Sequence, residues 1–358
     1  MSTLSNKQSS EVVIKVEHVW KIFGDNAQAA LRAIREKGLS KAEVLDRYDA
    51  VVGVADVSLD VKQGEIFCIM GLSGSGKSTL VRHFNRLLEP TDGKIIIEGT
   101  DVMGLDPMAL REFRNKKIGM VFQNFALMPH RSVIDNVAMP LEIRSMNKNE
   151  RMRQAMNMLR IVELDAWGNK FAHELSGGMQ QRVGLARALA ANPDVLLMDE
   201  PFSALDPLIR RQLQDEFIKL SAELNKTTIF ITHDLDEAVR IGDRIAIMRD
   251  GRFDQIGTAE EIVMNPEGDY VADFVAGISR LKVVKAHAVM QPFAEFVASN
   301  GNPPENAPRV AESESLSTLI RLAIDDDAPI VVQNNGKDIG IVTRSGILQT
   351  VIEGTEVS

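Results

Sequence analysis

The stretch GLSGSGKST at residues 71–79 constrains the fold more than any other part of this chain. It follows an apolar, strand-like segment and opens a helix-like one, which is the context that a phosphate-binding loop requires. Gly71, Gly74 and Gly76 let backbone N–H groups converge on phosphate oxygens, and the N-terminus of the following helix adds partial positive charge. The sequence therefore predicts a strand, a phosphate-binding loop and a helix in succession.

The side chains of this loop are expected to bind a nucleoside triphosphate. Lys77 is placed to reach the β- and γ-phosphates, and Ser78 to hold Mg²⁺. The alternative is a Gly/Ser-rich loop that arose by chance, which the strand before the loop disfavours. The nucleotide-binding positions predicted in the loop are Gly71, Ser73, Gly74, Ser75, Gly76, Lys77, Ser78 and Thr79.

Two carboxylates end another apolar segment, VLLMDEP at residues 195–201. Phosphoryl transfer depends on positioning and charge stabilisation. We therefore expect Asp199 to bind Mg²⁺, directly or through water, and Glu200 to polarise the attacking water as the catalytic base. Taken alone, the segment could be a strand capped by solvated acids.

Two further polar residues end strand-like segments. His233 ends FITH and Gln123 ends GMVFQ. Because the ends of parallel strands meet at one edge of a sheet, His233 can reach the γ-phosphate and the water. Gln123 can touch both Mg²⁺ and the water. A structural histidine and an ordinary polar strand terminus are the alternatives for these two positions.

Strand-like and helix-like segments alternate up to about residue 250, as in a mostly parallel sheet covered by helices. Helical patterns dominate between residues 128 and 191, which predicts a helical subdomain inserted in the sheet domain. A second helical insertion spans residues 26–50, where Ser40 and Glu43 form a capping-box pattern. The expected strands are EIFCIMG, KKIGMVFQ, DVLLMDE, TTIFITHD and RIAIMRDG.

The chain changes character after about residue 277. GNPPENAP reads as a loop, residues 316–323 place apolar side chains on one helix face, and PIVVQ and DIGIVT flank Asn335 and Gly336 as a hairpin would. We expect a small α+β module. Residues 281–358 hold six Lys or Arg against ten Asp or Glu, a net charge of −4, and these acids could also be a solvated face.

Composition narrows the classes of function. The net charge of −9 does not favour nucleic-acid binding, and no apolar run approaches the length of a membrane-spanning helix. The polar N-terminus lacks a secretory signal, so we expect a cytoplasmic chain. Cys68, the only cysteine, is expected in the core and fits a reducing compartment.

A second glycine-rich helix start, LSGGMQQRV at residues 175–183, lies between the phosphate loop and LLMDE. With GLSGSGKST, Gln123, SALD and His233 in this order, it resembles the nucleotide-binding subunit of an ABC transporter. The resemblance covers residues 11 to about 277. It implies an α/β fold in which a P-loop NTPase sheet domain of the ABC ATPase type carries an inserted helical subdomain, followed by the small module.

The same resemblance implies a homodimer of ATPase subunits that pair head to tail. The LSGG helix of one subunit would face the γ-phosphate bound by the other, so Ser176, Gly177, Gly178 and Gln180 would serve the ATP of the neighbour. A helix N-terminus is itself an anion site, which agrees with this role. Asp206 ends SALD, the loop that crosses the interface in this family.

Phe23 matches the aromatic residue that stacks on adenine in the family, which is usually Tyr. Phe keeps the π-face that stacking requires, and a core phenylalanine is the alternative. The helical insertion after Phe23, FALMPHRSV and SALDPLIR together resemble importers of glycine betaine, proline or related quaternary amines. The expected function is an ATPase that powers uptake of such a compatible solute.

A separate integral membrane permease would carry the solute, and a solute-binding protein would be an indirect partner. The ATPase would lie on the cytoplasmic face of the plasma (inner) membrane as a peripheral subunit. ABC ATPases of translation or DNA repair, which bind nucleic acid, and an ABC importer of another small solute are the alternatives.

The segment DIGIVTRSGIL resembles part of a CBS domain, so residues 278–358 are expected to form a CBS-like regulatory domain after a nucleotide-binding domain of residues 1–277. Adenosine-binding CBS domains usually carry Asp three residues after the Thr of this motif. Gly346 stands at that position, which disfavours nucleotide binding by the module.

Overall fold

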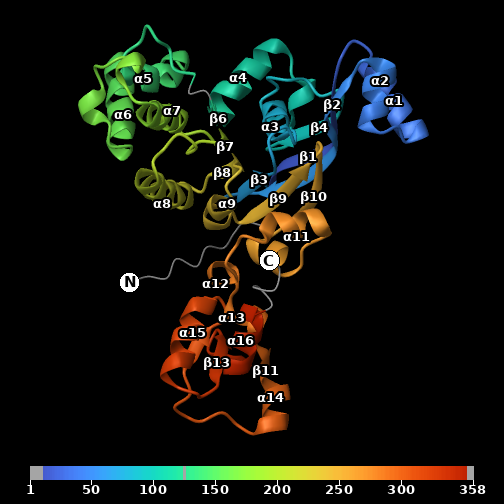
Figure 1. Cartoon of the computed structure of the whole chain (residues 1–358). Helices are drawn as coiled ribbons and strands as arrows, with labels where there is room; N and C mark the ends of the chain where they lie inside the picture. Colours follow the sequence, from blue (N-terminus) through green and yellow to red (C-terminus); the bar gives the residue numbers. More distant parts are fainter. Residues whose placement is uncertain (1–10, 124–125, 353–358) are drawn as a thin grey trace. The chain divides into compact units, whose positions relative to one another are not determined.

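The computed structural model describes residues 11–123 and 126–352 (Figure 1). The chain divides into two compact units, one up to Asp254 and one from Gln255 onward. The helices α10 and α11 fall in the second unit. The boundary at residue 277, between a nucleotide-binding domain and a regulatory domain, stays a prediction. Within the described ranges, no helix is long and apolar enough to cross a membrane.

A six-stranded sheet forms the centre of the first unit, in the order β10-β9-β3-β8-β7-β6. Five neighbouring strands of this sheet, β9, β3, β8, β7 and β6, pair in parallel. Every residue of β3, β7 and β8 is buried, as expected for apolar strands covered on both faces. All five strands expected from the sequence are confirmed. The strands are β3 (Ile66–Met70), β6 (Ile118–Val121), β7 (Val195–Asp199), β8 (Thr227–Ile231), β9 (Arg244–Arg249) and β10 (Arg252–Gly257).

A second, antiparallel sheet was missing from the sequence-based expectations. Its order is β2-β1-β4-β5, and its long strands alternate buried and exposed residues because the sheet is buried mainly on one face. Such alternation is less conspicuous in a sequence than a continuous apolar run. The strands are β1 (Val12–Phe23), β2 (Val51–Lys62), β4 (Asp92–Ile97) and β5 (Thr100–Asp101).

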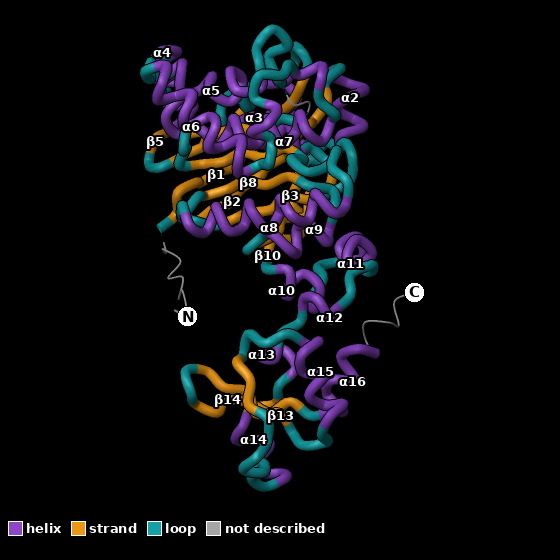
Figure 2. Tube along the Cα trace, turned by 90° about the vertical axis from the view of Figure 1, so that its left-hand side faces the viewer, coloured by secondary structure: helices purple, strands orange, loops and turns teal. Residues whose placement is uncertain are grey.

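Helices cover both faces of the parallel sheet. Figure 2 shows α8 and α9 along one side of β3 and α3 on the other. The helix α3 contacts β2 as well as β7 and β8, so it lies between the two sheets. Three phenylalanines, Phe202, Phe217 and Phe230, pack α8 against β8 with ring centroids 5.9–6.3 Å apart. The helices are α3 (Lys77–Phe84), α4 (Pro107–Lys117), α8 (Pro207–Glu223) and α9 (Leu235–Ile241).

The predicted helical subdomain is present. The helices α5 (Val133–Ile143), α6 (Lys148–Ile161) and α7 (Gly177–Ala190) contact one another and gather together in Figure 1. The insertion after β1 forms α1 (Ala27–Lys37) and α2 (Lys41–Tyr48). The capping box is confirmed, since the Ser40 backbone N–H donates to Glu43 and the Glu43 N–H donates to the Ser40 hydroxyl.

The second unit contains a small four-stranded sheet in the order β11-β14-β13-β12. The strands β13 and β14 pair as the predicted hairpin around Asn335 and Gly336, both with positive φ. Successive residues of β13 belong to two different apolar clusters. Val332 lies in the cluster with Leu316, and Val331 lies in the cluster with Phe296, so both faces of this small sheet are packed. The elements are α10 (Ala259–Met264), α11 (Asp269–Val275), α12 (Arg280–Val283), α13 (Ala286–Val289), β11 (Gln291–Pro292), α14 (Phe293–Asn300), β12 (Arg309–Ala311), α15 (Leu316–Asp325), β13 (Ile330–Asn334), β14 (Lys337–Val342) and α16 (Arg344–Ile352).

Candidate active site

The predicted phosphate loop connects β3 to α3 in a conformation that needs glycine. Gly71 has φ 150°, and a Cβ there would lie 2.1 Å from the Met248 carbonyl oxygen. Gly76 has φ 106°, and a Cβ there would lie 2.4 Å from the Gly53 carbonyl oxygen. Side chains at these positions would force the loop away from the sheet. The loop tip, Leu72 to Gly74, is exposed.

Lys77 folds back onto the loop that it follows. Its Nζ donates hydrogen bonds to the carbonyl oxygens of Gly71 (2.8 Å) and Leu72 (2.9 Å). Burial lowers the pKa of Lys77, while the nearby carboxylates of Glu200 and Asp199 act in the opposite direction. A cation and two carboxylates, separated by more than a hundred residues in the chain, therefore meet at the phosphate loop.

Ser78 and Asp199 are joined directly, since the Ser78 Oγ donates to the Asp199 Oδ1 at 2.9 Å. Asp199 is 1% exposed. Burial raises its pKa, whereas the Ser78 hydrogen bond and the charges of Arg82 and Lys77 lower it. A hydroxyl and a carboxylate are the hard oxygen ligands that Mg²⁺ prefers, so these residues fit the ion.

Glu200 is the meeting point of three strand ends. Its Oε2 lies 3.3 Å from the Gln123 Nε2 and 3.3 Å from the His233 Nδ1. These residues follow β6, β7 and β8, which are neighbours in the sheet. The Glu200 side chain is 16% exposed, and that of His233 is 61% exposed. The structure thus brings together all three predicted catalytic residues, and the Gln123 amide donates a hydrogen bond to the carboxylate of Glu200.

The backbone of Glu200 adopts φ 50°, a left-handed conformation that costs a non-glycine residue about 1–3 kcal/mol unless its surroundings hold it. The Glu200 N–H donates to the Ile231 carbonyl oxygen at 3.0 Å. The Glu200 carbonyl accepts from the Ser203 Oγ at 3.1 Å and from the Gln181 Nε2 at 3.1 Å. These bonds on both sides of the residue stabilise the strained turn.

Sequence reasoning missed Gln181, although a signal was present. Gln181, Leu185 and Ala188 recur at helical spacing, and all three are buried. A polar side chain on the buried face of a helix needs hydrogen-bond partners, so this position indicated a role in holding another segment.

Phe23 ends β1 and is 39% exposed. A Cβ on Gly53 would lie 2.7 Å from the Phe23 ring and 3.6 Å from the Thr79 Cγ2, so the ring lies across Gly53 beside α3. The Lys21 Nζ lies 5.1 Å from the ring centroid, within range of a cation–π interaction. The partly exposed ring lies close to Thr79 of the phosphate loop, where an adenine could stack on it.

The second glycine-rich helix start has a different setting. Ser176 and Gly177 are exposed, and the Ser176 Oγ accepts from the Met179 N–H as the N-cap of α7. The Gln180 Nε2 donates to the carbonyl oxygens of Ala172 (2.9 Å) and Leu175 (3.2 Å), which supports the turn before the helix. A Cβ on Gly178 would lie 3.1 Å from the Leu205 side chain. Asp206, at the end of the same loop, caps α8 through the Ile209 N–H.

Comparisons with known proteins agree with this geometry. Residues 54–203 match the ABC transporter family model. The glycine betaine/proline betaine transport system ATP-binding protein ProV of Salmonella typhimurium (strain LT2) is 47% identical over 93% of this chain and 81% of that protein. The trimethylamine N-oxide transport system ATP-binding protein TmoW of Ruegeria pomeroyi is 46% identical over 96% of this chain and 98% of that protein.

A solved structure extends the likeness to three dimensions. The dimeric post-hydrolysis state of the ATP-binding cassette MJ0796, bound to ADP and Pi, superposes with a TM-score of 0.60 and 33% identity. The match covers 69% of this chain and 98% of that one. The phosphate loop, the paired acids of β7 and the LSGG helix thus occur together in a chain that matches its relatives along most of its length. The chain belongs to the ABC transporter family, as one of its ATP-binding proteins.

Proposed function

We propose that this protein hydrolyses ATP to power the uptake of glycine betaine, proline, choline or a related compatible solute through a separate membrane permease. The observation that carries the proposal is the 47% identity with ProV over 93% of the chain. The meeting of Lys77, Asp199 and Glu200 at one loop supports the ATPase part.

Each group at the loop has a distinct task in hydrolysis. The backbone N–H groups of the loop and the Lys77 ammonium would stabilise charge on the β- and γ-phosphates. The Glu200 carboxylate would accept a hydrogen bond from the attacking water and orient it, with Gln123 and His233 fixing that carboxylate. Ser78, Asp199 and Gln123 would hold Mg²⁺, which supplies positive charge to the phosphates when bound.

We further propose a head-to-tail homodimer with two shared sites. In this arrangement Ser176, Gly177, Gly178 and Gln180 of one subunit face the γ-phosphate bound to Lys77 of the other. The exposure of Ser176 and Gly177 at the start of α7 supports the idea, since the first N–H groups of a helix lack partners within the helix. The dimeric state of MJ0796 is consistent with it.

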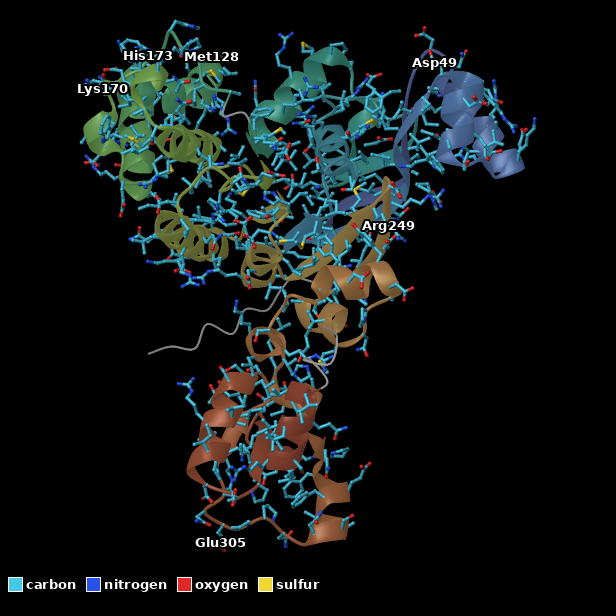
Figure 3. All side chains as sticks on the ribbon, in the orientation of Figure 1. Asp49, Met128, Lys170, His173, Arg249 and Glu305 are labelled. Carbon is cyan, nitrogen blue, oxygen red and sulfur yellow. The ribbon has the colours of Figure 1, made fainter. Side chains whose placement is uncertain are left out.

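The permease would dock on a groove between β6 and the helical subdomain. This groove of about 360 Å³ is lined mainly by apolar side chains, among them Met120, Phe122, Met139 and Pro140. Met128, labelled in Figure 3, also lines it. Phe122 immediately precedes Gln123, so pressure on the groove would reach the carboxylate of Glu200. Through this contact the chain would be peripheral, at the cytoplasmic face of the plasma (inner) membrane, with a solute-binding protein as an indirect partner and no role for nucleic acid.

Solute uptake tests the proposal. Cells that express this chain with a cognate permease and solute-binding protein should accumulate labelled glycine betaine, and cells carrying Lys77→Ala should not. Uptake that is unaffected by Lys77→Ala would refute the ATPase role. Trimethylamine N-oxide is the second candidate solute, because the match to TmoW spans 98% of that protein. Competition with unlabelled trimethylamine N-oxide distinguishes the two solutes.

We also propose that the CBS-like C-terminal module is regulatory. Its acids would make contacts that internal salt weakens, because screening shortens from about 10 Å at 0.1 M salt to about 3 Å at 1 M. Glu305, labelled in Figure 3, Asp326 and Asp327 are exposed. Neutralising all three to Gln and Asn should lower the salt concentration that activates transport in reconstituted vesicles. An unchanged activation midpoint would argue against this role.

A further inference from the structure

Gln181 is a buried side chain that joins the α7 helix to the loop of the catalytic base. It is 2% exposed. Its Nε2 donates to the Glu200 carbonyl oxygen at 3.1 Å, and its Oε1 accepts from the Ala204 N–H at 3.2 Å. One amide therefore holds both ends of the segment from Glu200 to Ala204.

The same turn of α7 packs on this segment. A Cβ on Gly178 would lie 3.1 Å from the Leu205 Cδ2 and 3.5 Å from the Ala204 carbonyl oxygen, so the helix approaches the loop closely. Ser176, five residues before Gln181, is exposed at the helix start. A displacement of that start would move Gln181 with the helix, because α7 is continuous from Gly177 to Ala190.

The bond to Glu200 acts on the strained part of the site. Glu200 has φ 50°, and the backbone turn at this residue determines where both its carbonyl group and its side chain lie. The Gln181 amide and the Ser203 hydroxyl both donate to that carbonyl. Loss of the Gln181 bond would leave only Ser203 on this carbonyl and would release Ala204 at the other end of the segment, so the turn that places the carboxylate beside Gln123 and His233 would be held less firmly.

We propose that Gln181 is a positioning residue that transmits the placement of the α7 start to the catalytic base of the same chain. This inference rests on the proposed function, in which the α7 start contacts the ATP of the partner subunit while Glu200 serves the ATP of its own subunit. Gln181 then couples the two sites of the dimer, so that Glu200 is aligned when α7 is seated on the neighbour's nucleotide.

The chain offers a matched control in its second unit. Gln255 is 7% exposed, donates from its Nε2 to the Asn265 carbonyl oxygen at 2.9 Å and accepts from the Glu267 N–H at 2.9 Å. Gln181→Met and Gln255→Met therefore remove the same two kinds of backbone hydrogen bond. The full-length variants are compared by single-turnover hydrolysis of bound ATP, whose rate constant does not depend on the fraction of folded protein.

Gln181→Met should lower this rate constant at least tenfold relative to Gln255→Met, with the Kd for ATP within twofold of wild type. Gln181→Glu keeps the acceptor for Ala204 and, when ionised, has no proton to donate to Glu200, so it should be slow as well at a pH at which the new carboxyl is ionised. In a Glu200→Gln background, Gln181→Met should change the residual rate less than twofold, because its effect passes through Glu200.

A Gln181→Met rate constant within twofold of Gln255→Met would overturn the inference, as would a large further loss in the Glu200→Gln background. These failures differ from failure of the proposed function. If the wild type releases no phosphate from ATP, the ATPase assignment falls and this inference falls with it. If the wild type is active and the Gln181 variants are equally active, only the positioning role is wrong.

Discussion

The two glycine-rich helix starts of this protein, at α3 and at α7, look alike in sequence and differ in structure. The N-cap of α3 is Gly76, which has φ 106° and no capping side chain, and the phosphate loop joins it to the fully buried strand β3. The N-cap of α7 is Ser176, whose hydroxyl accepts from the Met179 N–H, and Ser176 and Gly177 are exposed. The first start is called enclosed here because Lys77 is buried, and the second is called open because Ser176 and Gly177 are exposed.

This difference shows how similar local sequences acquire different roles. Both helices offer unpaired N–H groups and a partial positive charge at their first turn. At α3, the turn itself carries Lys77 and Ser78, and Asp199 of the same chain accepts from Ser78, so these groups come from one chain. At α7, Gln181 ties the helix to Glu200 instead, so the open start is connected to the chemistry only indirectly.

The largest expected effect on ATP turnover comes from Glu200, which belongs to neither helix start. Glu200→Gln should lower turnover by about 100-fold or more, since a general base contributes roughly 10²–10⁴. Both helix starts remain intact in this variant, so ATP should still bind and an ATP-bound dimer should accumulate. Phosphate release and light scattering measure the two properties. Glu112→Gln on the surface of α4 serves as the control, and full hydrolysis by Glu200→Gln would exclude the assignment.

A mixing experiment separates the enclosed helix start from the open one. Lys77→Ala damages phosphate binding in its own subunit, and Ser176→Arg blocks the γ-phosphate of the neighbour, so each variant alone should be inactive. Random pairing of equal amounts makes about half of the dimers mixed, each with one intact site, and predicts recovery to about a quarter of wild-type activity. This expectation requires that one site can work alone. An active, strictly monomeric wild type would contradict the shared site.

A buried histidine in α3 should make the stability of the protein depend on pH. His83 in α3 is fully buried, and burial lowers its pKa from 6.5 to about 4. Because the unfolded chain takes up the proton first, this contribution is complete above pH 6.5 and is lost as the pH falls toward 4. The loss amounts to about 3 kcal/mol.

His83→Leu should therefore flatten the fall in the free energy of unfolding between pH 7 and pH 4. Chemical denaturation at several pH values measures it. His130→Leu, at an exposed position, provides the matched histidine-to-leucine control. Equal slopes for wild type and His83→Leu would show that His83 is not the group responsible.

The smallest expected effect concerns the cap of the open helix. Ser176→Ala should cost about 1 kcal/mol of stability, the usual value for an N-cap serine. Ser132→Ala removes a comparable cap from α5, where the hydroxyl accepts from the Asp135 N–H. Both variants should lose similar stability in denaturation, but only Ser176→Ala should also weaken ATP-dependent dimerisation. Equal dimerisation by the two would assign Ser176 to helix capping alone.

Much of the fold follows from local patterns in the sequence. The five parallel strands are continuous apolar runs, and Ser40 and Glu43 form a capping box that depends on four consecutive residues. Asn335 and Gly336 adopt the positive φ angles that a tight hairpin requires. The antiparallel sheet was missed because its alternating residues carry a weaker signal than a buried run.

The candidate site divides in the same way. Residue types and spacing predicted Lys77, Ser78, Asp199, Glu200, Gln123 and His233, because ends of parallel strands converge on one edge of a sheet. They did not predict Gln181 or the left-handed backbone of Glu200. Nor did they predict that Lys21 lies over the Phe23 ring.

By itself, the sequence determined where the five parallel strands run, which glycines form the phosphate loop and which carboxylates end β7. These features depend on apolar runs, on backbone freedom at single residues and on chemistry at neighbouring positions. Only the tertiary structure decided that Glu200 sits in a strained turn held by Gln181 from another subdomain. That bond joins residues 19 positions apart on separate elements. It exists because the packing of α7 on the loop buries the Gln181 amide beside the Glu200 carbonyl, which also accepts from Ser203, and no pattern of adjacent residues encodes that contact.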